Sequence, residues 1–143
     1  MEDEFGAGGG GDLWARPRPS RYRGPVDDVL AERVLRVVER IPPGRVASYG
    51  DIGEIVGIGP RYVGRVLSTY GSGVPWWRVV NASGDPGGGL IERARVHWAS
   101  EAITVKPNGK GCRIVTYRAD LEALATAYDL AAQDLDTLGV EPE

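Results

Sequence analysis

The fold is decided by residues 41–84, which read IPPGRVASYGDIGEIVGIGPRYVGRVLSTYGSGVPWWRVVNASG. Ser48 followed three residues later by Asp51 is a capping-box pattern, which predicts that a helix begins here. A short apolar stripe follows and ends at Gly57, and a second stripe at helical spacing occupies residues 60–70. Two short helices joined by a tight, glycine-bearing turn predict a helix-turn-helix unit.

A longer helix is predicted before this stretch. Apolar residues recur at helical spacing from Val26 to Ile41, and Pro42-Pro43-Gly44 then stops the pattern. Residues 1–24 hold a run of glycines, and prolines among arginines, so they cannot bury enough apolar surface to offset the entropy of ordering. They are interpreted as a flexible N-terminal arm. Its arginines could touch phosphates, but a solvated tail is the simpler interpretation.

The chain that follows the helix-turn-helix alternates between short elements. Residues 74–81 enter through a proline and are rich in valine and tryptophan, which predicts a strand. Residues 90–101 are predicted to be helical, and residues 103–115 to form a hairpin around the Asn108-Gly109 turn signal, where a winged helix carries its wing. Apolar spacing predicts one acidic amphipathic helix over residues 119–138.

These elements together predict one domain. A chain of 143 residues with 42% hydrophobic content can bury one core but is too short for two ordinary domains. We expect a mainly helical α+β fold, with a winged helix-turn-helix-like domain over residues 25–115 and an acidic helical extension over residues 116–143. Because no run approaches about 18 uncharged apolar residues, we expect no membrane partner and a cytoplasmic location, at the nucleoid in a prokaryote.

The sequence contains few residues that could bind a metal or form a disulfide. Cys112 is the single cysteine and His97 the single histidine, so an internal disulfide is excluded and no cluster for a structural zinc is proposed. We therefore expect no metal and no cofactor. No histidine stands beside Cys112 to lower the pKa of its thiol, which favours an inert thiol over a reactive one. His97 is interpreted as a surface or half-buried residue instead of a base.

The formal net charge of −3 argues against nucleic-acid binding, but the distribution of charge along the chain does not. Residues 25–112 hold eleven basic and nine acidic side chains, whereas residues 113–143 hold two basic and seven acidic ones. The acidity therefore belongs mostly to the C-terminal end. The weakly positive central part permits DNA binding without demonstrating it.

The exposed face of the second short helix carries two cationic and two small side chains, namely Arg61, Gly64, Arg65 and Ser68. Small residues let a helix approach a groove closely, and flanking arginines supply phosphate contacts or a probe into the base stack. An ordinary solvated face with a tolerated glycine explains the same pattern equally well. The residues alone leave both interpretations open.

Residues 26–105, and the quoted stretch above all, resemble the C-terminal domain of the O6-alkylguanine-DNA alkyltransferases, whose signature is Pro-Cys-His-Arg followed by Val-Val. The resemblance implies a fold of the alkyltransferase C-terminal type, in which the helix-turn-helix binds the minor groove of duplex DNA. It also implies that the tyrosine of Ser48-Tyr49 rotates the phosphate of the target nucleotide, and that Arg61 fills the space left by the flipped base.

The signature is altered at the two positions that carry the chemistry. Pro75-Trp76-Trp77-Arg78 places tryptophans where the family has its cysteine and its histidine. Alkyl transfer needs a thiolate generated by a neighbouring base, and an indole nitrogen is a donor only, so we assign no catalytic residue. The first replacement resembles the alkyltransferase-like subfamily, which usually keeps the histidine. Trp77 therefore puts in question any relay to a downstream acid such as Glu101.

A pocket for the flipped base is expected beside Trp76, because an aromatic wall returns about 1–3 kcal/mol per base against the cost of unstacking. The expected lining is Tyr49, Pro75, Trp76, Trp77, Arg78, Val79, Gly87, Gly88 and Gly89. Two alternatives stay open. The glycines would form a plain flexible loop, and the tryptophans would be core aromatics, with Arg78 paired to a nearby carboxylate.

Three functions are compatible with these residues. The first is a non-enzymatic sensor, expected to be a monomer, that binds O6-alkylguanine in double-stranded DNA and, as the resemblance implies, hands the lesion to nucleotide excision repair proteins. The second is an alkyl-accepting enzyme that uses Cys112. The third is a winged-helix transcription regulator that reads a fixed sequence in the major groove. The sensor is favoured because the pocket motif is kept without its nucleophile.

Overall fold

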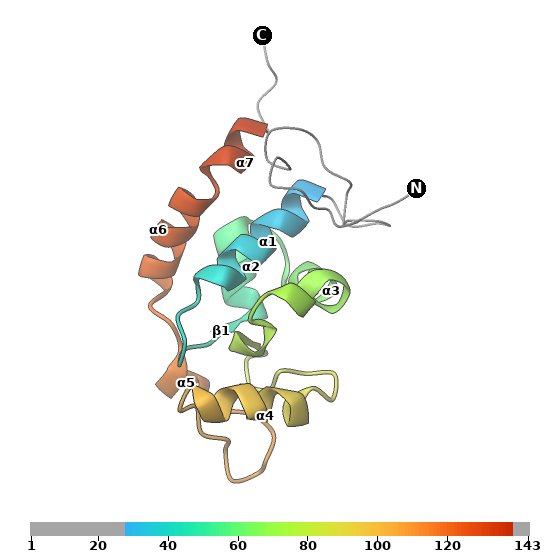
Figure 1. The fold of residues 1–143 in the computed structure, drawn as a ribbon, viewed down its shortest axis with the longest axis vertical. Helices are drawn as coiled ribbons and strands as arrows, with labels where there is room; N and C mark the ends of the chain where they lie inside the picture. The colour runs from blue at the N-terminus through green and yellow to red at the C-terminus, as the bar shows by residue number, and fades with distance from the viewer. Residues whose placement is uncertain (1–27, 139–143) are drawn as a thin grey trace.

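Helix α1 lies at the centre of the larger of two hydrophobic clusters, with α2, α3 and α6 packed around it (Figure 1). The computed structural model describes residues 28–138, and in it α1 spans Asp28–Arg40. The helix is fully buried along one stripe, made of Ala31, Val34, Leu35, Val37 and Val38. The helix predicted over residues 26–41 is confirmed in its described part. The predicted N-terminal arm lies outside the described residues.

The predicted helix-turn-helix is confirmed by α2 (Tyr49–Val56) and α3 (Pro60–Tyr70). The capping box forms as expected: the Ser48 hydroxyl accepts a hydrogen bond from the Asp51 amide at 2.9 Å, and the Asp51 carboxylate accepts one from the Ser48 amide at 2.9 Å. Gly57 ends α2 in the left-handed conformation, and Gly59 with Pro60 begins α3.

The turn between α2 and α3 is tight enough to demand a glycine at position 53. Its carbonyl oxygen accepts hydrogen bonds from the amides of Gly57 at 2.7 Å and Ile58 at 2.8 Å. A Cβ atom on Gly53 would overlap the carbonyl oxygen of Ile58. The close contact of these backbones fixes the angle at which α3 leaves the core.

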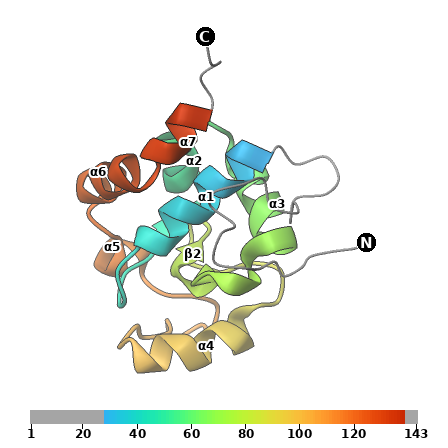
Figure 2. The ribbon, with the colours of Figure 1, turned by 45° about the horizontal axis from the view of Figure 1, so that its top comes forward.

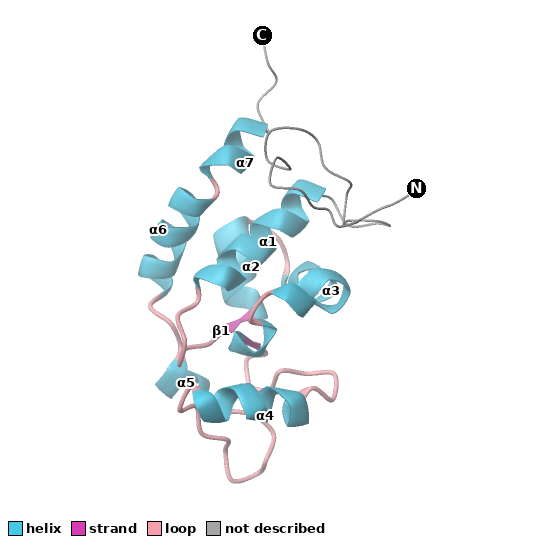
Figure 3. Cartoon of the chain, viewed as in Figure 1, coloured by secondary structure: helices cyan, strands magenta, loops and turns pink. Residues whose placement is uncertain are grey.

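A single two-stranded parallel sheet joins the halves of the described chain (Figure 3). Strand β1 (Ala47–Ser48) pairs with β2 (Val79–Val80) in the register Ala47↔Val79 and Ser48↔Val80. The pairing places the start of α2 beside the residues that follow the Trp76-Trp77 pair. It thereby positions Tyr49 relative to Trp76.

The strand predicted over residues 74–81 is wrong except at Val79–Val80. The chain forms the 3-10 turn η4 (Trp76–Arg78) within this range, and another, η3 (Gly71–Gly73), just before it. Pro75 cannot donate to a ladder, and its carbonyl oxygen instead accepts a hydrogen bond from the Arg78 amide at 3.0 Å, which closes η4.

The smaller cluster lies under α4 (Ile91–Ser100), which confirms the helix predicted over residues 90–101. The predicted hairpin wing is wrong. Only one antiparallel bridge forms, between Val105 and Cys112, and α5 (Ile114–Tyr117) takes the place of its second strand. The turn itself forms, with Gly109 at a positive φ of 74°. The next rung would pair Ile103 with Ile114, but the Ile103 amide donates to the Trp98 carbonyl oxygen at 2.9 Å, and the Ile114 carbonyl oxygen accepts from the Arg118 amide at 2.8 Å.

The single helix predicted over residues 119–138 is two helices, α6 (Leu121–Ala131) and α7 (Gln133–Leu138), which run along α1 (Figure 2). The break coincides with a tertiary contact, because Arg36 of α1 donates to the Ala131 carbonyl oxygen at 2.6 Å and pairs with Asp134 at 2.8 Å. Leu124, Tyr128 and Leu135 bury their side chains in the cluster around α1. None of the described helices has the length and apolar content to cross a membrane.

Arg118, just before α6, ties the C-terminal region to the helix-turn-helix. Its Nε and Nη2 atoms each donate to an Asp51 carboxylate oxygen at 2.9 Å, and the Ala119 amide donates to the Val46 carbonyl oxygen at 2.8 Å. Burial pushes the pKa of Asp51 upward, but hydrogen bonds from Arg118 and Ser48 outweigh it, and the pKa is lowered. The capping carboxylate of α2 is thus held by a residue far along the chain.

Candidate nucleic-acid interface

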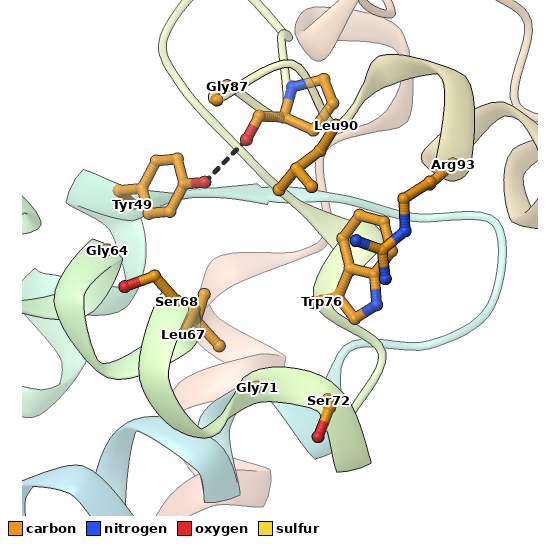
Figure 4. A pocket seen from close by; sticks show the side chains of 12 residues that line it. Tyr49, Gly64, Leu67, Ser68, Gly71, Ser72, Trp76, Gly87, Leu90 and Arg93 are labelled. Atoms are coloured by element: carbon orange, nitrogen blue, oxygen red, sulfur yellow. Dashed lines mark hydrogen bonds between the residues drawn. The ribbon is translucent and has the colours of Figure 1, made fainter.

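A pocket of about 520 Å³ lies between the start of α2, the face of α3 and the loop that leads into α4 (Figure 4). Six of its lining residues were named from the sequence: Tyr49, Gly64, Ser68, Trp76, Gly87 and Gly88. The other six are Leu67, Gly71, Ser72, Pro86, Leu90 and Arg93. The structure therefore brings the face of α3 and the expected base site together in one cavity.

Several of the expected residues do not line this pocket. They are Pro75, Trp77, Arg78, Val79 and Gly89 from the expected base site, and Arg61 and Arg65 from α3. The residues that were missed carried weak signals: Leu67 belonged to a core stripe, and Arg93 to a predicted helix whose exposed face had no assigned role. Their place in the pocket depends on how α3 and α4 face each other, which spacing within one helix does not reveal.

Tyr49 spans the pocket from α2 to the glycine-rich loop. Its hydroxyl donates a hydrogen bond to the carbonyl oxygen of Pro86 at 2.9 Å, which Figure 4 marks as a dashed line. Burial, and then the nearby Asp85 carboxylate, raise the pKa of the Tyr49 hydroxyl. The hydroxyl is therefore protonated at neutral pH. The α-carbon of Gly64 faces the tyrosine ring, where an added Cβ would lie 3.9 Å from it.

Trp76 forms the wall opposite Tyr49 (Figure 4). Its ring is half-buried, meets Trp77 edge to face with centroids 5.8 Å apart, and carries the Arg93 guanidinium 5.3 Å from its centroid. A cation in this position is attracted by the quadrupole of the indole ring. The residue at the family's cysteine position thus presents a large aromatic surface to the cavity.

Trp77 does not line the pocket and packs against the smaller core cluster. Its ring stacks on His97 with centroids 3.6 Å apart and an interplanar angle of 6°. Its Nε1 atom donates to Glu101 Oε2 at 2.9 Å. The tryptophan at the family's histidine position therefore makes the contact with Glu101 that a relay histidine would need, but it offers only a donor.

Glu101 connects the 3-10 turn η4 to the chain that follows α1. Its carboxylate pairs with Arg78 at 2.6 Å and accepts from the Gly44 amide at 3.0 Å, while Arg78 Nη1 also donates to the Ile41 carbonyl oxygen at 2.8 Å. Burial acts to raise the pKa of Glu101, but hydrogen bonds from Arg78, Gly44 and Trp77 outweigh it and the pKa is lowered. Arg78 thus has the carboxylate partner expected of it, although it sits in a 3-10 turn and not in a strand.

The outward face of α3 carries Arg61 and Arg65, both exposed. The Arg65 guanidinium lies 5.6 Å from the centroid of the Tyr62 ring, and Ser68 Oγ donates to the Arg65 carbonyl oxygen at 3.1 Å. Gly64 and Ser68 of the same face reach the pocket. A surface with two exposed cations therefore borders on the cavity.

Cys112 is fully buried and is not among the residues that line the pocket. Burial raises the pKa of its thiol to about 11. A thiol that is neither accessible nor ionised at neutral pH is a poor alkyl acceptor. In the described part of the chain, no three histidine, cysteine or acidic side chains gather in a group that could hold a metal ion.

Residues 29–103 match the family described as 6-O-methylguanine DNA methyltransferase, DNA binding domain. The chain belongs to this family. Its relatives include proteins named DNA base-flipping protein from Escherichia coli strain K12 and Shigella flexneri, each 33% identical over 103 residues, which cover 68% of this chain and 80% of the relative. Another of that name, from Vibrio parahaemolyticus, is 33% identical over 89 residues and is covered to 89%.

Two solved structures of the S. pombe alkyltransferase-like protein share the fold of this family member. One is Atl1 in complex with damaged DNA containing O6-carboxymethylguanine, with a TM-score of 0.58 and 26% identity. The other is S. pombe ATL in complex with DNA, with a TM-score of 0.55 and 27% identity. Each likeness covers 66% of this chain and 97% of the other. The resemblance and the fold class predicted from the sequence are confirmed.

Proposed function

We propose that this protein recognises O6-alkylguanine in duplex DNA, turns the modified base into the pocket beside Trp76, and leaves the alkyl group in place. The main support for the proposal is that residues of α3 and Trp76 line one cavity. Support comes from relatives named DNA base-flipping protein and from the likeness to Atl1 in complex with damaged DNA.

The dimensions and lining of the cavity suit a flipped base. Its volume of about 520 Å³ falls within the range of about 300–1,000 Å³ that is common for small-molecule sites. Flipping costs a few kcal/mol, and contact with an aromatic wall returns about 1–3 kcal/mol per base. Trp76 supplies that wall, and Leu67 and Leu90 supply apolar contacts for an alkyl group.

The face of α3 would hold the duplex. In this role Gly64 lets the helix sit deep in the minor groove, Arg65 and Ser68 contact the backbone, and Arg61 enters the stack where the base has left. Tyr49, which lines the cavity and is held by its hydrogen bond to Pro86, would contact the phosphate of the turned nucleotide. Arg61 and Arg65 are exposed and are oriented on the same side as the cavity-lining residues of α3.

The absence of alkyl transfer follows from the residues around the cavity. Neither Trp76 nor Trp77 supplies a nucleophile or a base, and the buried Cys112 thiol stays protonated. A bound lesion would therefore persist as a marker. Delivery of the marked site to nucleotide excision repair proteins by a monomer is the continuation that the family resemblance suggests.

The decisive experiment compares matched duplexes that differ only in guanine or O6-methylguanine, by fluorescence anisotropy at one stated salt concentration. The protein should prefer the lesion whatever the flanking sequence, and labelled methyl groups should stay on the DNA. Equal affinity for both duplexes, an affinity that follows the flanks, or label on the protein would each defeat the proposal.

Two variants test the assigned roles. Trp76→Ala should lower the preference for the lesion by about tenfold, which corresponds to the loss of about 1.4 kcal/mol of stacking. Arg61→Ala should weaken binding to the lesion duplex by a similar factor. Arg40→Ala, which removes an exposed cation from the end of α1, is the charge-matched control and should change little.

A further inference from the structure

Among the described residues that line the pocket, Arg93 carries the only charged side chain. It lies in the first turn of α4, and its guanidinium sits over Trp76, 5.3 Å from the ring centroid. Within residues 28–138 it has no carboxylate partner, whereas Arg95, two positions along the same helix, contacts Glu92 at 3.8 Å. The pocket therefore contains an uncompensated positive charge (Figure 4).

The two acids that stand beside lining residues in the sequence make contacts with groups other than Arg93. One Asp85 carboxylate oxygen accepts a hydrogen bond from the Gly87 amide at 2.7 Å, and Glu92 faces Arg95. The remaining lining is made of apolar side chains, glycines, hydroxyl groups and the indole of Trp76. The described lining of the cavity therefore offers the guanidinium no carboxylate.

A guanidinium that stacks on an indole keeps its N–H groups at the rim of its plane, where they can bind a carboxylate through two parallel hydrogen bonds. The geometry points to Arg93 as a specificity-determining residue that makes the pocket prefer guanine adducts whose O6 substituent bears a carboxylate. This inference rests on the proposed function. The same cation gives no such bond to an uncharged adduct, which would only reduce its hydration.

The expected preference is moderate. The Arg93 side chain is exposed, so water and salt screen its attraction for an anion. We expect a duplex with O6-carboxymethylguanine to bind about five- to tenfold more tightly than one with the uncharged, equal-sized O6-carbamoylmethylguanine. The ratio should fall toward one as salt is raised.

The test measures the affinity of four matched duplexes, with guanine, O6-methylguanine, O6-carboxymethylguanine and O6-carbamoylmethylguanine, for the wild-type protein and three variants. Arg93→Gln should abolish the difference in affinity between the carboxylate and the carboxamide duplexes. Arg93→Lys should keep part of the difference in affinity between the carboxylate and the carboxamide duplexes. The positive charge remains, but the two parallel N–H donors of a guanidinium are lost. Arg95→Gln removes a charge from the same helix and should leave the ratio unchanged.

Three results would overturn the inference. One is equal wild-type affinity for the carboxylate and carboxamide duplexes, and a second is the same ratio in Arg93→Gln as in the wild type. The third is an equal loss by Arg93→Gln on all four duplexes, which would assign Arg93 to a DNA phosphate. Failure of the proposed function is recognised separately, since the wild type would then bind guanine and O6-methylguanine equally.

Discussion

Replacing Glu101 by alanine tests whether the turn that presents Trp76 depends on a buried ion pair. The carboxylate and the Arg78 guanidinium are 10% and 13% exposed, and they lie 2.6 Å apart. The substitution also removes the acceptor for the Trp77 indole N–H and for the Gly44 amide. Among the described residues, Arg78 would keep the Ile41 carbonyl oxygen as a hydrogen-bond acceptor and the Trp77 ring, whose centroid lies 5.6 Å from its guanidinium.

Breaking a buried pair by removing one partner costs about 3–5 kcal/mol, because an uncompensated charge stays behind. Some water reaches both side chains, so we place Glu101→Ala near the lower end, at about 3 kcal/mol of unfolding free energy. Glu101→Gln keeps a neutral acceptor and should cost less, about 1–2 kcal/mol. Replacing both charges, as Arg78→Met with Glu101→Leu, should recover part of the loss.

Urea unfolding followed by circular dichroism at 222 nm measures these values without depending on the tryptophans at the site. A loss below about 1 kcal/mol in Glu101→Ala would refute the reasoning, as would a double variant no more stable than the single one. Lesion binding should weaken in parallel, since Trp76 belongs to the same 3-10 turn as Arg78.

The same pair predicts a dependence on pH. The pKa of Glu101 is lowered from its ordinary 4.5 in the folded protein, so its contribution is present above that value and is lost as the pH falls through the folded pKa. The difference in unfolding free energy between wild type and Glu101→Ala should therefore shrink below about pH 4.5. A difference that stayed constant down to pH 2 would contradict the lowered pKa.

Three further predictions concern the surrounding chain. Gly84→Ala should destabilise the protein by about 3 kcal/mol or more in urea unfolding, because φ is +87° there and the new Cβ would overlap the Cys112 carbonyl oxygen. A thiol reagent such as dithionitrobenzoate should leave Cys112 unmodified in the native protein at pH 8 and modify it fully in urea, because burial raises its pKa to about 11; rapid native labelling would revive the alkyl-acceptor alternative. Trp76→Cys should not restore methyl transfer in a labelled-DNA assay, since Trp77 offers no base; a methylated protein would contradict this.

Local patterns were sufficient for α2 and α3 because the causes of these two helices lie within a few residues. The capping box of Ser48 and Asp51 and the glycine that ends α2 act inside one turn. The prediction of the hairpin wing was wrong because the deciding contact lies outside the segment that was used to predict it. The Asn108-Gly109 signal was correct for the turn, but the Ile103 amide, which a second rung would have needed, donates to the carbonyl oxygen of Trp98 instead.

The identities of residues 76 and 77 were enough to predict that the nucleophile and its base are missing, since that conclusion needs only the chemistry of the indole group. Which indole faces the cavity depended on tertiary structure. Trp77 is drawn inward by Glu101, 24 residues away, and Trp76 is left beside Arg93 from another helix. Side-chain direction in a short 3-10 turn is set by such distant partners, because the turn has no regular period of its own that a sequence pattern could reveal.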